Sequence, residues 1–480
     1  MTRQPKARQG APWRSGSTER GHVLLVYYFF PPAAGGGIPR PAKMAKYLRR
    51  LGWEVTVLTV AAHGAVDALL EVRPDVRVIR AAEWPADPLL RIAGGAVRLA
   101  RRAWERITPM GGPGTASLLD LGFVDEEREI EASKIGWTVP GVAAAVALDR
   151  QRPVDIAVVS SPPASSGGIG VLLRALRGIP YVVEYRDPWT VGPFWALAAD
   201  GKPRNDPVTR LRFTVARRLE SMLLRWASGV VIVNGEDHVG RLRTEFPAQT
   251  ALKPVAHIPN GVDLEDAVGF AAVTAQGTPG QVRLLHNGYF YHFHTPHHLV
   301  AALRAIRRER AETLRGVEFE FVGDGFPERL ARQAERWGLG PNIRLTPTMS
   351  FSQSLRAMHA ADGLIVVLPP LASDDDRIPT KLYEYLSTGR PIFAAVSPDG
   401  ATARLLRTVP DAVVADNRDV RAMADALVSF VAMVRHRQVT GAPPEVAQRA
   451  AAHGYAARAS QMDTFLRGIL SEAARRTSRR

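Results

Sequence analysis

Four charged residues lie close together near the end of the second half of the sequence: Asp376, Arg377, Lys381 and Glu384. Pro379 suits the first turn of a helix and Gly389 its end. Lys381 and Glu384 are three positions apart, so both project from one helical face near the N-terminus of that helix. A cation beside the positive end of a helix suits a diphosphate, and a carboxylate can accept hydrogen bonds from ribose hydroxyls. Taken alone, the same residues also fit a capped surface helix with an ion pair.

A glycine-rich loop, PPAAGGG at 31–37, follows an apolar run and precedes a helix. Glycines at 35, 36 and 37 let backbone N–H groups approach a ligand closely, and the helix N-terminus adds partial positive charge. A tight strand–helix turn that needs positive φ explains the same glycines equally well. We therefore keep Gly35, Gly36 and Gly37 as candidate ligand-binding residues.

Asp187 stands in the sequence RDPW, directly after a predicted strand at 181–185. A carboxylate at this place could orient or deprotonate an acceptor hydroxyl. It could also cap a turn, with Arg186 as its partner. A third motif, IPNGVD at 258–263, has by itself the features of an Asn-Gly turn at the end of a strand.

These motifs need a scaffold, and the apolar runs predict two parallel sheets in succession. In the first half we predict strands at 22–30, 54–60, 155–160, 181–185, 229–234 and 256–258, with helices at 41–51, 167–177 and 208–227. In the second half we predict strands at 282–287, 317–323, 342–345, 363–368 and 391–395. Two doubly wound α/β domains facing each other follow, with a ligand in the cleft beyond the carboxyl ends of their strands.

The domain boundaries follow from changes in composition along the chain. Residues 1–21 form a basic tail that we predict to be disordered, and 22–265 form the first domain, with a less regular insertion at 61–150. Residues 266–280 make a linker, 281–445 the second domain, and 446–480 a C-terminal helix that returns to the first domain.

The charge balance favours polyanionic partners. Lys and Arg number 62 against 47 Asp and Glu, a net charge of +15, and there is no cysteine for a disulfide or a thiolate metal site. No motif or interleaved aromatic pattern for nucleic acid accompanies the charge, so we expect no nucleic-acid partner. The N-terminus has no apolar core of a secretory signal, and we expect a cytoplasmic protein.

The stretch 89–107 predicts an amphipathic helix, with Trp104 and leucines on one side and arginines on the other. A basic polar face opposite an apolar one is typical of a helix lying on an anionic membrane surface. An ordinary helix packed on the sheet is the competing interpretation. We expect peripheral attachment to the inner face of the cytoplasmic membrane.

Taken together and in this order, PPAAGGG, RDPW, IPNGVD, VEFEFVGDG and PTKLYEYLSTGRP resemble the retaining GT-B glycosyltransferases of family 4. The branch with such motifs is associated with bacterial polysaccharide and glycoconjugate synthesis. The resemblance implies a GT-B fold, with two facing Rossmann-like doubly wound domains and a central cleft. It also implies transfer of a sugar, with retention of its anomeric configuration, from a nucleotide diphosphate donor to a glycan or lipid-linked acceptor.

The family's pair of glutamates, with seven residues between them, falls on Asp376 and Glu384. By this resemblance Glu384 holds the ribose, Asp376 faces the donor sugar, and the glycine-rich loop borders the diphosphate and the acceptor. Many relatives carry an Arg and a Lys after the first strand of the second domain, where this chain has His286, Asn287 and Gly288.

Because the departing diphosphate still needs charge compensation, we expect Lys381 to supply it, with Arg377 or His294. Gly288 completes the expected donor site.

Four histidines, His292, His294, His297 and His298, suggest a metal site, but no carboxylate is near them in the sequence. GT-B enzymes as a fold usually need no metal, and we expect none here.

Two alternatives stay open at this point. One is a nucleotide-sugar 2-epimerase on the same fold. The other is a catalytically degenerate partner subunit, suggested by Asp376 and by the missing Arg and Lys.

Overall fold

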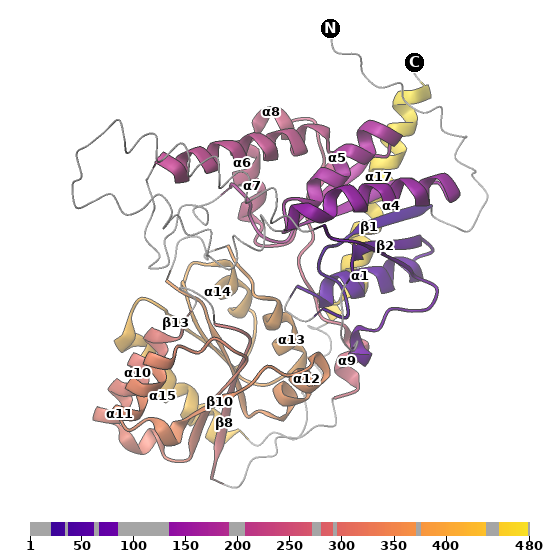
Figure 1. The fold of residues 1–480 in the computed structure, drawn as a ribbon. Coiled ribbons are helices and arrows are strands. Elements are labelled where there is room, and N and C mark those ends of the chain that lie inside the picture. Colours follow the sequence, from indigo (N-terminus) through magenta and orange to yellow (C-terminus); the bar gives the residue numbers. More distant parts are fainter. Residues whose placement is uncertain are drawn as a thin grey trace.

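The computed structural model describes residues 21–33, 37–61, 67–84, 134–191, 207–270, 280–290, 295–370, 376–437 and 451–478. The chain forms two α/β domains, each built on a parallel sheet with helices on its faces (Figure 1). This confirms the predicted fold class, two Rossmann-like domains in the GT-B arrangement.

The N-terminal domain has a seven-stranded sheet of order β3-β2-β1-β4-β5-β6-β7. Its strands are β1 His22–Val26, β2 Glu54–Val60, β3 Arg77–Ala81, β4 Ile156–Ser161, β5 Tyr181–Tyr185, β6 Gly229–Ile232 and β7 Val255–His257. Its helices are α1 Pro39–Arg50, α4 Thr138–Gln151, α5 Ser166–Arg177, α6 Pro207–Trp226, α7 Asp237–Glu245 and α8 Pro247–Thr250, with short 3₁₀ turns η1 Ala68–Leu70 and η2 Lys134–Trp137. The order of the strands reverses between β1 and β4, which is where such sheets bind ligands.

The C-terminal domain has a six-stranded sheet of order β10-β9-β8-β11-β12-β13. Its strands are β8 Val282–Asn287, β9 Val317–Val322, β10 Ile343–Thr346, β11 Gly363–Val367, β12 Ile392–Val396 and β13 Ala412–Asp416. Its helices are α10 His297–Glu309, α11 Glu328–Arg336, α12 Phe351–Ala360, α13 Thr380–Thr388, α14 Ala401–Leu406 and α15 Val420–His436, with 3₁₀ turns η4 Ala311–Leu314 and η5 Gly340–Asn342.

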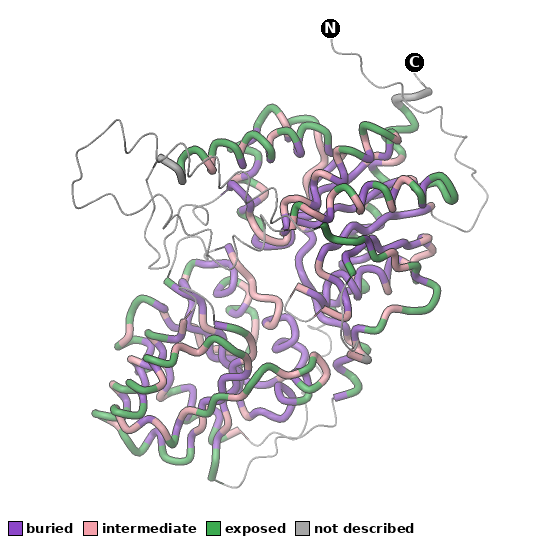
Figure 2. Tube along the Cα trace, viewed as in Figure 1, coloured by how far each residue is buried: buried purple, intermediate pink, exposed green. Residues whose placement is uncertain are grey.

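The first strand shows why an uninterrupted apolar run forms the centre of a sheet. Successive side chains of β1 point to opposite faces, so Leu24 and Val26 enter the core on one side, and Val23 and Leu25 the core on the other. Both faces are buried, and the tube in Figure 2 is mostly purple along the central strands of each sheet. A parallel sheet covered on both faces needs apolar residues at every position of its central strands.

The chain crosses between the domains twice. The first crossing follows the short helix α9, Leu264–Val268. After the second, α17 (Tyr455–Ser478) packs beside α1 in the N-terminal domain, where the Trp53 indole Nε1 donates a 2.9 Å hydrogen bond to Asp463. Tyr455, Met462 and Leu466 belong to the core between α1, α17 and the sheet.

The structure differs from the sequence prediction within 61–150. Here β3 and α4 are regular parts of the N-terminal domain, and β3 forms the edge of its sheet. The predicted amphipathic helix at 89–107 and residues 1–20 of the tail predicted at 1–21 lie outside the described residues. Of the helices within the described ranges, none is long and apolar enough to cross a membrane.

Candidate active site

A cavity of about 900 Å³ lies between the two domains, at the carboxyl ends of their central strands. The N-terminal domain lines it with residues after β1 and β5 and at the start of α1, and the C-terminal domain with residues after β8 and at the start of α13. Six of the predicted site residues line this cavity: Gly37, Asp187, Gly288, Arg377, Lys381 and Glu384. The structure therefore brings together residues that are as much as 347 positions apart, the separation between 37 and 384.

Helix α13 presents its N-terminus to this cleft. Pro379 precedes the helix, and Gly389 ends it in the left-handed conformation with φ of 67°. Its first residue, Thr380, receives a 3.1 Å hydrogen bond from the Asn260 amide of the N-terminal domain. No side chain caps the N-terminal N–H groups of this helix in the described structure. Those groups and the helix dipole favour an anion at this end.

Lys381 is a partly buried cation whose close contact is a histidine ring. Its ammonium Nζ donates a 2.7 Å hydrogen bond to Nε2 of His286 at the end of β8. Burial lowers the pKa of Lys381 to about 7, helped by the Arg377 guanidinium and opposed by the Glu384 carboxylate. Burial, with the nearby Lys381 charge, lowers the pKa of His286 well below its ordinary value, so the ring stays neutral and accepts. An anion in the cleft would stabilise the charged form of Lys381.

Gly288 leaves room for this lysine. Its φ is +131°, a conformation that side chains rarely adopt, and a Cβ built on it would lie 3.2 Å from Lys381 Nζ. The backbone after β8 thus approaches the lysine more closely than another residue would allow.

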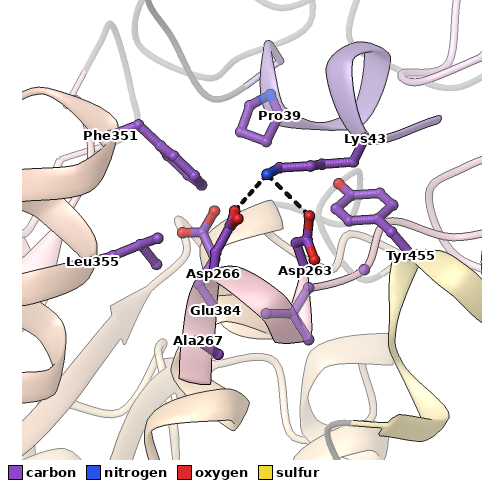
Figure 3. Close-up of a pocket in the computed structure, with 11 residues that line it drawn as sticks. Pro39, Lys43, Asp263, Asp266, Ala267, Phe351, Leu355, Glu384 and Tyr455 are labelled. Carbon is purple, nitrogen blue, oxygen red and sulfur yellow. Dashed lines mark ion pairs between the residues drawn. The ribbon is translucent and has the colours of Figure 1, made fainter. Parts of the chain in front are cut away.

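Glu384 faces the same cleft from the next turn of α13 and is buried. Burial raises the pKa of its carboxyl to about 8, the nearby Asp266 adds to the rise, and Lys381 opposes it. Figure 3 shows the small pocket behind Glu384, where Lys43 of α1 makes ion pairs with Asp263, at 3.0 Å, and with Asp266, at 2.6 Å. Burial raises the pKa of Asp266 to about 6 in spite of Lys43. The Glu384 carboxyl, which its raised pKa keeps neutral, can ionise when hydrogen-bond donors approach it. Such a group suits the recognition of hydroxyl groups.

Asp187 and Arg377 meet across the cleft from opposite domains. Arg377 Nη2 lies 3.7 Å from Asp187 Oδ1, and the Asn234 amide donates a 2.9 Å hydrogen bond to the same oxygen. The Asp187 side chain is 46% exposed, so one face of the carboxylate stays accessible in the cleft.

Asp376 lies at the interface between the domains. It is absent from the residues lining the cavity, and its buried carboxylate makes an ion pair with Arg241 of α7 in the N-terminal domain. The Asp376 carbonyl oxygen lies against Gly235, where a Cβ would come within 2.2 Å of it. The packing of these two loops turns the side chain towards the domain interface, and a contact with a donor sugar stays a prediction.

Arg186 holds the glycine-rich loop in place, whereas the sequence suggested this arginine only as a partner of Asp187. Arg186 Nη1 donates to the Gly37 carbonyl at 3.0 Å and Nη2 to the Pro162 carbonyl at 2.8 Å. A Cβ on Gly37 would lie 2.4 Å from Nη1, so glycine is needed for this close approach. Gly35 and Gly36 lie outside the described residues.

Sequence reasoning also missed the buried ion pair beneath this loop. Arg40 donates two hydrogen bonds to Glu184, at 2.8 and 3.1 Å, and one to the Pro259 carbonyl, at 2.8 Å. One signal was available: a single glutamate interrupts the apolar strand YVVEY, and a buried carboxylate needs a partner.

The histidines do not assemble a metal site in what the structure describes. His297 contacts the Thr295 hydroxyl, and His298 contacts the Asn417 carbonyl. His292 and His294 lie outside the described residues. Within the described ranges no group of three His, Cys, Asp or Glu side chains is arranged to hold a metal ion.

Two family models match this two-domain chain. A glycosyl transferase 4-like domain matches residues 35–261, and the glycosyl transferases group 1 model matches 281–432. The chain is a GT-B glycosyltransferase. The two matches meet at the cleft, one on each side of it.

Solved structures share the fold of this glycosyltransferase at low identity. Sucrose-phosphate synthase from Thermosynechococcus elongatus aligns with a TM-score of 0.63 and 17% identity, over 94% of this chain and 100% of that one. WaaG, a glycosyltransferase involved in lipopolysaccharide biosynthesis, aligns with a TM-score of 0.51 and 13% identity, over 94% and 98%.

A protein assigned as a UDP-N-acetylglucosamine 2-epimerase, from Listeria monocytogenes, aligns with a TM-score of 0.50 and 12% identity, over 94% and 97%. No curated protein matches the sequence.

Proposed function

We propose that this glycosyltransferase moves a sugar from a nucleoside diphosphate donor to a hydroxyl acceptor with retention of the anomeric configuration. The observation that carries the proposal is the pair Lys381, partly buried, and Glu384, buried, on the cleft wall at the N-terminus of α13. The ammonium and the N-terminal N–H groups of α13, which no side chain caps in the described structure, suit a diphosphate, and the carboxyl suits ribose hydroxyls.

The proposed chemistry asks the protein for electrostatic stabilisation rather than for a nucleophile. As the bond between the sugar and the phosphate breaks, negative charge grows on the departing diphosphate. Lys381, held by neutral His286 and with Arg377 nearby, is placed to compensate that charge. In the retaining mode the departing phosphate itself assists the incoming hydroxyl, so we propose no covalent intermediate and no metal.

We assign the acceptor to the wall formed by the N-terminal domain. Asp187 is fixed by Asn234 and partly exposed in the cleft, which supports a role in orienting or deprotonating the acceptor hydroxyl. We propose a glycan or lipid-linked acceptor in cell-envelope polysaccharide, glycolipid or other glycoconjugate synthesis. The structural similarity to WaaG and the positive net charge are consistent with this assignment and with work at the inner face of the cytoplasmic membrane.

The test begins with a panel of UDP-, GDP- and ADP-sugars screened by thermal shift, because donor binding raises the unfolding temperature by mass action. The best donor is then incubated with and without acceptors, and the product is examined by NMR. An unchanged anomeric configuration in a new glycoside supports the proposal. Inversion would contradict the retaining mode, and conversion of the donor at C2 without any acceptor would assign the 2-epimerase reaction instead.

A further inference from the structure

Helix α6 carries a row of exposed apolar side chains that sugar transfer does not use. Spacings of four, four, three and four residues place the members of this row on one face of the helix. We call the row the α6 stripe; its members and their exposed fractions are Leu211 (64%), Val215 (48%), Leu219 (47%), Met222 (44%) and Trp226 (38%). A row of this length on the outer face of a domain helix marks an interaction surface.

Helix α6 packs on the N-terminal domain through a different face from the stripe. Ala216, Leu223 and Leu224 on the inner side are buried in the core of the domain. An ordinary surface helix is polar on the side away from such a core. The stripe is therefore additional to what holds α6 in place, and Figure 2 shows the outer side of this helix exposed along much of its length.

The charged residues beside the α6 stripe indicate which kind of partner it binds. Arg218 and Arg225 are exposed along one edge of the stripe, and Arg212 lies along the other. The single carboxylate of the helix, Glu220, is buried and accepts hydrogen bonds from the N–H and the hydroxyl of Thr190. An apolar strip bordered by guanidinium groups matches a lipid surface, where apolar side chains enter the acyl boundary and arginines meet the phosphates.

A second copy of this chain fits the stripe less well. Two stripes packed face to face would bring Arg218 and Arg225 of each copy close to the other, with no outward carboxylate on either helix to pair with them. Like charges set against each other disfavour such a contact.

We infer that the α6 stripe docks the N-terminal domain on an anionic lipid surface. The docking surface is linked to the acceptor wall, because Glu220 of α6 holds Thr190, three residues after Asp187. A lipid surface against α6 would thus bring lipid-linked molecules near the acceptor side of the cleft. The inference goes beyond the proposed reaction, and the measurement of vesicle binding needs neither donor nor acceptor.

The experiment measures co-sedimentation of the full chain with vesicles of phosphatidylcholine, with and without phosphatidylglycerol. The stripe variant is Leu211→Ser/Val215→Ser/Met222→Ser, and the matched control is Leu345→Ser, a leucine 48% exposed on β10 of the other domain. We expect wild type and control to bind vesicles that contain phosphatidylglycerol, and the stripe variant to bind at least about tenfold more weakly. Arg218→Gln/Arg225→Gln should lose about fivefold for each arginine and lose the preference for the anionic lipid.

Circular dichroism and sugar transfer to a soluble acceptor should be unchanged in the stripe variant, which shows that folding and catalysis are intact. Unchanged vesicle binding by this variant would overturn the inference, and so would a wild-type dimer that the same substitutions convert to a monomer. Neither result would affect the proposed reaction, which is tested separately by donor binding and by NMR of the product.

Discussion

The charged residues on the two walls of the cleft differ in the partners that they contact. On the N-terminal wall Arg40 is paired with Glu184, and Arg186 is bonded to two backbone carbonyls. On the C-terminal wall the close contact of Lys381 is a neutral histidine, and the pKa values of Lys381 and Glu384 are shifted towards their neutral forms. Paired charges build the fold, whereas a partly buried charge whose close contact is a neutral ring is held ready for a ligand.

The largest effect should come from breaking the pair on the N-terminal wall. Arg40 and Glu184 are 1% and 0% exposed, so Arg40→Met leaves a carboxylate buried without its cation. We expect a loss of about 3–5 kcal/mol in the free energy of unfolding, measured with urea. The double variant Arg40→Met/Glu184→Leu should recover most of it. A stable single variant would show that the pair does not build this wall.

Substitution on the C-terminal wall should act on turnover instead. Lys381→Ala should lower kcat by about 10²–10³-fold, because the departing diphosphate loses its cation. The thermal midpoint should stay the same or rise, since a partly buried cation whose close contact is neutral is removed. Lys381→Arg should retain more activity than Lys381→Ala. Full turnover with normal donor affinity in Lys381→Ala would remove this residue from the mechanism.

Glu384 should make stability depend on pH in a defined window. Its pKa rises from an ordinary 4.5 to about 8 on folding, so between these values the folded state binds more protons than the unfolded state. The stability that the protonated form provides is complete below about 4.5 and is lost as the pH rises through about 8.

Glu384→Gln should therefore be more stable than wild type at pH 8–9 and equal to it near pH 4.5, as compared by thermal unfolding in matched buffers. A constant difference between the two proteins across this range would contradict the assignment.

The smallest effect should come from Asp376, which lies between the walls. Its partner Arg241 is 40% exposed, so Asp376→Asn should cost only about 1 kcal/mol of stability. Turnover should change by less than about threefold if the residue only joins the domains. A loss of more than about 100-fold in kcat with unchanged folding would instead restore the donor-sugar contact that the family pattern implies.

The sequence was informative wherever one short segment contained both the pattern and its chemistry. The ranges predicted for the second strand of the N-terminal domain, 54–60, and for the first strand of the C-terminal domain, 282–287, agree with β2 and β8. Apolar runs of this kind specify buried parallel strands. The α13 helix, with Lys381 and Glu384 on the cleft wall, followed from their spacing and from the flanking proline and glycine.

What the sequence did not predict depends on long-range contacts. The strands β3 and β13 were missed. Each lies at an edge of its sheet, where most of its side chains are exposed or only partly buried, and β3 carries two arginines among the five residues RVIRA. The contact of Asp376 with Arg241 joins residues 135 positions apart and depends on how the two domains dock. No local pattern encodes such a distance.

The central claim, that the C-terminal wall binds the donor, is tested most directly by isothermal titration of UDP, GDP and ADP into wild type, Glu384→Ala and Asp187→Asn. Losing a carboxylate that bonds to the ribose should weaken the preferred nucleotide at least about tenfold in Glu384→Ala. Asp187→Asn, on the opposite wall, should stay within about twofold of wild type. Equal affinity for that nucleotide in wild type and Glu384→Ala would contradict the account.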